Sequence, residues 1–130
     1  MINVDTNVLI RAFLADDKDQ ATKAQNLIVK ASEKNELFIS SYALLEFVWV
    51  LKTKKFTREE VYEAVITLVD STGVIIGQRD VILEAAEKYI KGKADFGDYM
   101  ILCEGEKSGA HQMATFDQKI LSEQTHASSP

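Results

Sequence analysis

The stretch LFISSYALLEFVWVL, residues 37–51, is a short apolar strand that runs into an apolar helix. Leu37 to Ile39 is typical of a buried strand, and Ser40 or Ser41 can cap the helix that follows. Glu46 is the only charged residue in the stretch. We therefore expect Glu46 to lie deep in the core, where an isolated ionised carboxylate is costly. A carboxylate retained there predicts a buried cation or a functional site.

Strands and helices alternate along the whole chain. Besides residues 37–39, the predicted strands are residues 2–4, 73–77 and 111–115. Helices are predicted over residues 7–14, after Asp17 or Asp19, after Ser40 or Ser41, from Thr57, from Asp80, from Asp95 to about Lys107, and over residues 117–121. Uniformly apolar strands indicate a parallel sheet that helices cover on both faces. The predicted fold class is α/β, a three-layer α/β/α sandwich around a short, mainly parallel sheet.

The composition indicates one compact domain. The chain has 130 residues, of which 46% are hydrophobic and 27% are charged, enough for a real core. The only proline is Pro130, so no proline-rich linker divides the chain. We predict a single domain over residues 1–122. Residues 123–130 are small and polar, and we expect them to fray.

The cysteine content and the net charge indicate the type of compartment and the classes of partner to expect. The single Cys103 cannot form an intrachain disulfide, which suits a reducing cytoplasm. The apolar run at residues 8–14 is short and contains Arg11, so we expect neither a signal peptide nor a membrane span. A net charge of −5 argues against a general nucleic-acid coat. It leaves room for an enzyme with local basic patches, although the Lys and Arg clusters also read as solvated helix ends.

Four acidic residues occupy related places in the predicted fold. Asp5 ends the first strand and Asp117 follows the last. Glu46 lies on the helix that leaves the second strand, and Asp98 lies in the first turn of the helix before the last strand. Ligands of open parallel sheets bind outside the carboxyl ends of the strands. We therefore expect the four side chains to converge on one edge of the sheet.

A cluster of this kind calls for a cation. Two like charges about 4 Å apart repel by roughly 4 kcal/mol at an effective dielectric of about 20. Ligation by oxygen alone, without matched Cys or His partners, favours Mg²⁺ or Mn²⁺ over Zn²⁺. Such ions serve phosphoryl chemistry, because they neutralise phosphate oxygens and lower the pKa of water.

Each acid except Glu46 also has a purely structural explanation. Asp5 and Asp117 could be N-caps, and Asp98 could interact with a helix dipole. Asp95 fits an N-cap with Asp98 three residues later, which competes with a role for Asp95 as a metal ligand. Glu46 has no such explanation, because it lies well inside its helix.

Four segments resemble, in order and spacing, the motifs of PIN-domain proteins. They are VDTNVLI at residues 4–10, LLEFVWVL at 44–51, ADFGDYMI at 94–101 and ATFD at 114–117. The resemblance implies a metal-dependent endoribonuclease in which Asp98, rather than Asp95, is the main acid of the third motif. Its acidic set would be Asp5, Glu46, Asp98 and Asp117, with Asn7 and Thr115 as polar supports. The compact length resembles the toxin halves of VapBC toxin–antitoxin pairs, which implies an RNA substrate, a small antitoxin and a homodimer.

Several rival functions fit less well. A haloacid-dehalogenase-type phosphatase needs a second aspartate at position 7, where the chain has Asn7. A response-regulator receiver needs an acceptor aspartate at the end of a middle strand, where the chain has Gly77. A Cys103–His111 nucleophile pair has nothing to orient it, and an inert, partly buried cysteine is the better interpretation. A zinc site is not supported by His111 and His126.

Two alternatives remain open. The chain could be a non-toxin RNA-processing nuclease, or a non-catalytic RNA- or protein-binding module on the same fold. Apolar residues on two helices could likewise form either core or a groove for an antitoxin segment. These residues are Val8, Leu9, Ala12, Phe13, Phe47, Val48, Val50 and Leu51.

Overall fold

The computed structural model describes residues 1–130 and contains seven helices and five short strands. The strands are β1 (Ile2–Asn3), β2 (Leu37–Ile39), β3 (Val74–Ile76), β4 (Met113–Ala114) and β5 (Ala127–Ser128). The helices are α1 (Thr6–Leu14), α2 (Lys18–Glu33), α3 (Ser41–Thr53), α4 (Arg58–Asp70), α5 (Arg79–Lys91), α6 (Phe96–Lys107) and α7 (Gln118–Glu123). Every predicted element is present, in the predicted order.

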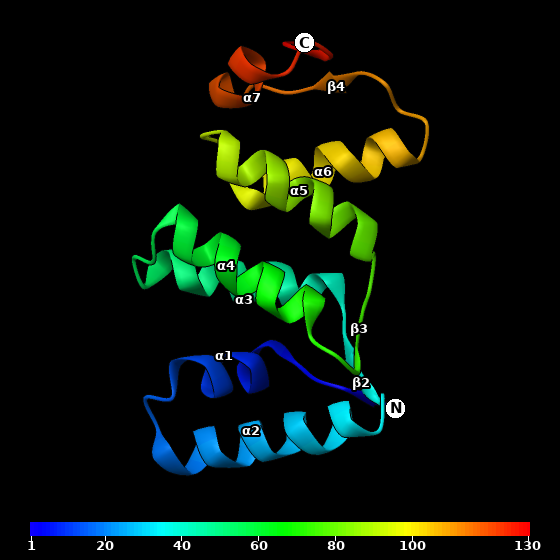
Figure 1. Cartoon of the computed structure of the whole chain (residues 1–130). Helices are drawn as coiled ribbons and strands as arrows, with labels where there is room; N and C mark the ends of the chain where they lie inside the picture. The colour runs from blue at the N-terminus through cyan, green and yellow to red at the C-terminus, as the bar shows by residue number, and fades with distance from the viewer. The chain divides into compact units, whose positions relative to one another are not determined.

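Contacts divide the chain into two compact units, Met1–Arg79 and Asp80–Pro130. The first unit holds a three-stranded parallel sheet in the order β1-β2-β3, with Leu37 paired to both Ile2 and Val74. Helices α1 and α2 connect β1 to β2, and α3 and α4 connect β2 to β3 (Figure 1). The parallel sheet with helical crossovers confirms the α/β fold class.

The core of the first unit lies where its helices meet the sheet. Helix α1 packs against α2 and α3, α3 packs against α4, and α4 packs against β3. Leu37 and Ile39 of β2 are almost completely buried, as are Leu44 and Leu51 of α3. Burying such side chains contributes roughly 1.5–3 kcal/mol each relative to leaving them in water.

A glycine closes the turn before β3. Gly73 has φ +81°, and a Cβ atom there would lie 1.8 Å from the backbone oxygen of Ser32 at the end of α2. No side chain fits this approach, and the left-handed conformation adds strain for any other residue. Gly73 therefore lets the chain enter β3 against the end of α2.

The second unit contains α5, α6 and α7 and a parallel pair of strands, β4 and β5. The buried Tyr99 donates its hydroxyl hydrogen to Glu123 Oε2 at 2.5 Å, and Glu123 Oε1 accepts the backbone N–H of Lys93 at 2.6 Å. The Tyr99 hydroxyl oxygen also accepts the backbone N–H of Ala94 at 3.1 Å. These bonds hold the loop before α6 to the end of α7.

The C-terminal segment differs from the sequence-based expectation. Residues 123–130 were expected to fray, whereas Glu123 ends α7 and Ala127–Ser128 form β5. The β4–β5 pairing is reinforced by the N–H of Thr115, which donates to the backbone oxygen of Ser128 at 3.0 Å. Backbone pairing of this kind leaves no trace in side-chain composition, which is why a small, polar segment was assigned to a tail. The prediction of one domain over residues 1–122 stays a prediction.

None of the helices combines the length and the apolar character that spanning a membrane requires.

Candidate active site

Glu46 does not lie in the core. It is exposed on α3, together with Tyr42 and Trp49, which are 77% and 65% exposed. The core-facing side of the same helix buries Phe47 and Val48. The prediction of deep burial was therefore wrong. It failed because nearly every neighbour of Glu46 is apolar, while only one face of α3 meets the core.

Glu46 instead borders an open cleft between the start of α1 and the middle of α3. The cleft has a volume of about 450 Å³ and is lined by Asp5, Thr6, Asn7, Glu46, Trp49 and Val50. The Thr6 hydroxyl donates a hydrogen bond to Glu46 Oε2 at 2.9 Å. Two acids from motifs that are far apart in sequence thus line the same cleft.

Thr6 is a site residue that sequence reasoning missed. Asn7 is expected to support the pocket, and it does line the cleft, but the side chain that donates a hydrogen bond to Glu46 is that of Thr6. Thr6 lies between Asp5 and Asn7 in the first motif, so its position was a usable signal. Its hydroxyl fixes one carboxylate oxygen of Glu46.

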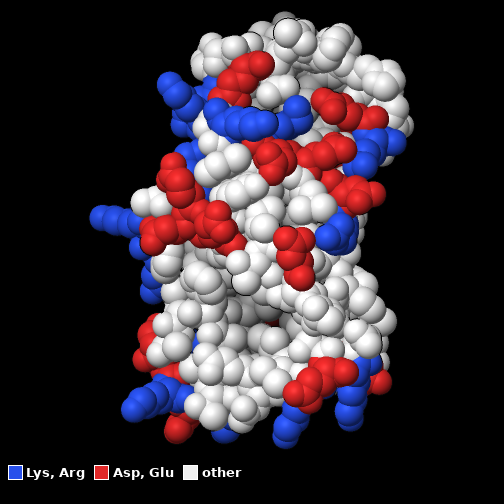
Figure 2. Space-filling view, in the orientation of Figure 1, with Lys and Arg blue, Asp and Glu red and all other residues white.

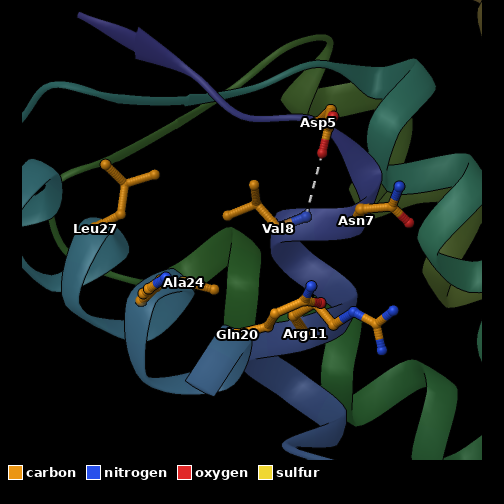
Figure 3. A pocket seen from close by; sticks show the side chains of 8 residues that line it. Asp5, Asn7, Val8, Arg11, Gln20, Ala24 and Leu27 are labelled. Carbon is orange, nitrogen blue, oxygen red and sulfur yellow. Dashed lines mark hydrogen bonds between the residues drawn. The ribbon is translucent and has the colours of Figure 1, made fainter. Parts of the chain in front are cut away.

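Asp5 is also the N-cap of α1. Its Oδ1 accepts the backbone N–H of Val8 at 3.2 Å (Figure 3). Capping engages Oδ1 and fixes the carboxylate at a helix N-terminus, so Oδ2 can bind a cation at the same time. The cap explanation and the metal explanation are therefore compatible for Asp5.

Asp5 and Asn7 also line a second cavity, between α1 and α2. Its volume is about 490 Å³, and Arg11, Gln20 and Lys23 contribute polar side chains to it. The face of the first unit drawn in Figure 2 is hollowed in this region, and mostly uncharged atoms border the hollow. Asp5 thus stands between two open cavities of the first unit.

The acids of the third motif lie at the start of α6. Asp95 is the N-cap residue, and its backbone N–H donates to Asp98 Oδ2 at 3.3 Å. This arrangement confirms the predicted cap position of Asp95. Asp98 lies in the first turn and is partly exposed. Whether Asp95 also binds a metal stays a prediction.

Asp117 is the N-cap of α7. Its Oδ1 accepts the backbone N–H of Ile120 at 2.9 Å, and its own N–H donates to the Thr115 hydroxyl oxygen at 3.0 Å. Thr115 therefore holds the backbone of Asp117 within the fourth motif, and its role as a support of the pocket stays a prediction. Phe116, between them, is 78% exposed.

The donor set of the first unit fits a hard cation. Asp5 and Glu46 offer carboxylate oxygens to one open cleft, and Mg²⁺ is commonly held by one or two carboxylates together with water and substrate phosphate. In neither unit do three His, Cys, Asp or Glu side chains gather into a complete metal site. The joint action of Asp5, Glu46, Asp98 and Asp117 stays a prediction.

Cys103 has no part in this site. It is fully buried in α6, and burial raises the pKa of its thiol to about 11. Because the thiolate is the nucleophilic form, the thiol is inert at neutral pH. Its burial and raised pKa agree with the expectation of an inert cysteine, although Cys103 is fully rather than partly buried.

Comparisons with known proteins cover almost the whole chain. Residues 2–123 match the family described as PIN domain. The VapC ribonuclease of Aquifex aeolicus (strain VF5) is 26% identical over 119 residues, which are 90% of this chain and 87% of that protein. No solved structure matches significantly. The family match includes all four predicted acids, and it also includes Glu123.

Proposed function

The chain belongs to the PIN domain family, and we propose that it is an endoribonuclease that hydrolyses RNA phosphodiester bonds with Mg²⁺, for which Mn²⁺ can substitute. Its similarity to a protein named VapC ribonuclease supports this activity and substrate class. The observation that carries the proposal is the cleft that Asp5 and Glu46 share, with Glu46 fixed by the Thr6 hydroxyl.

In this proposal Asp5, Glu46, Asp98 and Asp117 hold the cation. When bound, a divalent cation neutralises phosphate oxygens and lowers the pKa of water. The protein's own contribution is orientation. Helix caps fix one oxygen of Asp5 and one of Asp117, and Thr6 fixes one oxygen of Glu46. Without the cation, these carboxylates repel the phosphates of RNA, so activity requires metal.

The test is cleavage of single-stranded RNA by the purified protein. We expect cleavage with Mg²⁺ or Mn²⁺ and none in excess chelator. Asp5→Asn should abolish cleavage and leave the fold intact, because asparagine caps helices about as well as aspartate. Asp17→Asn is the matched control, since Asp17 caps α2 through its Oδ1 but lies outside the cleft.

Two results would overturn the proposal. Full activity in chelator would show that cleavage needs no metal. Full activity of Asp5→Asn would show that this cleft is not the catalytic site. RNA binding by the wild-type protein without cleavage, with either metal present, would favour the non-catalytic binding module instead.

We further propose that the protein is the toxin of a toxin–antitoxin pair and forms a homodimer. The support is its similarity to a VapC protein. Of the apolar residues on α1 and α3 that could form either core or a groove, Leu9, Phe47 and Val48 lie in the core. Phe13 remains 44% exposed and packs edge-on against Phe47, with ring centroids 5.5 Å apart.

Co-expression with the product of an adjacent upstream gene tests the antitoxin proposal. We expect a stable complex in which the nuclease activity is suppressed. A lone gene whose overexpression leaves growth unchanged would favour a housekeeping RNA-processing nuclease.

A further inference from the structure

Trp49 is the only tryptophan of the chain, and it is 65% exposed. Tryptophan is highly buried on average, so a largely exposed indole asks for an explanation. Its position offers one, because Trp49 lines the same cleft as Asp5 and Glu46. A flat aromatic surface thus borders the carboxylates that are proposed to act on RNA.

The outer face of α3 carries a second exposed aromatic residue besides Trp49. Tyr42 is 77% exposed and lies two helical turns before Trp49, on the same face, with Glu46 between them. Tyr42 does not line the cleft, whereas Trp49 does. Both residues therefore have an exposed aromatic side chain, but only the side chain of Trp49 also lines the cleft.

A basic side chain of α1 lies at the cavity beside the cleft. Asn7 lines both the cleft and this cavity, and Arg11, one turn later, lines the cavity; in Figure 3 its guanidinium extends to the same side of α1 as Asn7. The guanidinium of Arg11 contacts Asp16 Oδ1 at 3.5 Å, and both side chains are about half exposed. Exposed ion pairs of this kind are weak, so a phosphate can replace Asp16 as the partner of Arg11.

We propose that Trp49 stacks on a nucleobase of single-stranded RNA and that Arg11 contacts a backbone phosphate of the same strand. The inference rests on the proposed function, because it assigns how the substrate lies beside Asp5 and Glu46. Stacking on an aromatic residue next to a backbone-binding cation is the usual way to hold a single strand. Such stacking accepts any base, so Trp49 contributes affinity and placement rather than sequence choice.

The fluorescence of the single tryptophan tests the stacking directly. The full-length Asp5→Asn variant, which should leave RNA intact, is titrated in Mg²⁺ with a short single strand of uridines. We expect saturable quenching of Trp49 emission. Inorganic polyphosphate carries the charge without the bases, and we expect it to leave the emission unchanged. Quenching by both probes, or by neither, would overturn the stacking.

Matched variants test affinity by a method that does not depend on tryptophan, such as anisotropy of a labelled strand. Trp49→Ala should weaken binding by roughly five- to 150-fold, the range for losing one stacked base. Trp49→Phe should keep most of the affinity. Tyr42→Ala is the control, because it removes an equally exposed aromatic side chain outside the cleft, and it should bind like the wild type.

Salt dependence tests the phosphate contact. Arg11→Gln should reduce the slope of log affinity against log salt by about 0.7, the value for one phosphate contact on a single strand. Arg79→Gln is the control, since Arg79 also forms an exposed pair with an aspartate, Asp70, at 3.5 Å and lines neither of the two clefts. An unchanged slope in Arg11→Gln would overturn this contact.

The outcomes separate the inference from the proposed function. Quenching and base-dependent binding without any cleavage in Mg²⁺ or Mn²⁺ would support the inference and contradict the nuclease. Normal cleavage with equal binding by Trp49→Ala and Tyr42→Ala would contradict the inference alone. A Trp49→Ala variant that changes only the oligomeric state would show that α3 meets another protein chain, and would also overturn the inference.

Discussion

Thr6 and Glu46 form the one side-chain hydrogen bond between the first two motifs in the structure. The bond fixes the orientation of a carboxylate that is otherwise exposed. Residues that orient metal ligands typically change metal affinity by 10- to 100-fold when they are replaced. We therefore expect Thr6→Val to weaken the apparent affinity for Mn²⁺, measured from the metal dependence of RNA cleavage, by roughly tenfold or more. Thr22→Val is the control, because the Thr22 hydroxyl bonds only to the backbone of α2; an equal loss there would refute a positioning role.

The exposure of Glu46 changes what its replacement should do. Glu46→Gln keeps the shape and removes one of the two carboxylates of the cleft. We expect the metal-free protein to be at least as stable as the wild type, because repulsion of Asp5 falls. The stabilisation that Mn²⁺ adds should shrink, since a ligand stabilises in proportion to its binding of the native state. Thermal unfolding with and without Mn²⁺ measures both effects. A clear loss of metal-free stability would mean that the charge of Glu46 has a structural partner.

Cys103 predicts a measurable pH dependence. Burial raises the pKa of its thiol from 9.0 to about 11. Between these values the unfolded chain has released the proton and the folded chain still holds it, so stability should fall as the pH rises from about 9 to 11. The contribution is at most about 3 kcal/mol. Cys103→Ala removes it, and denaturant unfolding at pH 8 and pH 10 should show a smaller pH effect in the variant. Identical pH effects in both proteins would contradict the burial argument.

The local sequence indicated which acids could cap helices. It did not indicate which side chains are exposed, because exposure depends on tertiary packing. Asp5, Asp95 and Asp117 precede apolar helical segments, and each is an N-cap. The burial of Glu46 was misjudged, because exposure depends on which face of a helix meets the sheet. Thr6 was missed because its partner lies forty positions away.

Helix α3 shows why apolar composition misleads at the scale of an element. Its apolar residues run around the whole circumference, which favours a helix buried on all sides. The structure instead buries one face and exposes Tyr42, Glu46 and Trp49 on the other. Apolar composition alone therefore does not tell which face of a helix meets the core.

The start of α6 depends on the end of α7. Glu123 accepts the Tyr99 hydroxyl and the Lys93 N–H, and a Cβ at Gly92 would lie 2.0 Å from that hydroxyl. Glu123→Ala leaves both donors without this acceptor, and the loss costs roughly 1–3 kcal/mol for the part-buried Tyr99 hydroxyl. We expect reduced stability in denaturant unfolding and weaker RNA cleavage, because Asp98 follows this loop. Glu104→Ala, on the exposed face of α6, should change neither the stability nor the cleavage. If Glu123→Ala also changed neither, the loop before α6 would not depend on Glu123.

The order of the helices and strands could largely be predicted from the pattern of apolar residues in the sequence. Alternating apolar strands and amphipathic helices predicted the order of all seven helices and the parallel sheet. The pairing of β4 with β5 was not readable, because it is made by backbone groups of a polar segment. The division into two compact units was also not readable, since no proline-rich linker marks it.

The division gives the metal proposal its sharpest test. Asp5 belongs to the first unit and Asp117 to the second, and the proposed reaction needs both. Residues that act as one catalytic unit are strongly non-additive, so that removing a second member costs little once the first is lost. We expect Asp5→Asn and Asp117→Asn each to reduce RNA cleavage to a small residual rate, measured in single-turnover assays with excess protein, and the double variant to lose no more than either single variant.

Both substitutions keep a side chain that can cap a helix, so each variant should unfold like the wild type. Asp17→Asn combined with Asp117→Asn is the control pair, and it should behave like Asp117→Asn alone because Asp17 caps α2 outside the cleft. Losses that multiply in the Asp5 and Asp117 double variant would show that the two acids act independently. In that case the first unit, with Asp5 and Glu46, would have to hold its own cation.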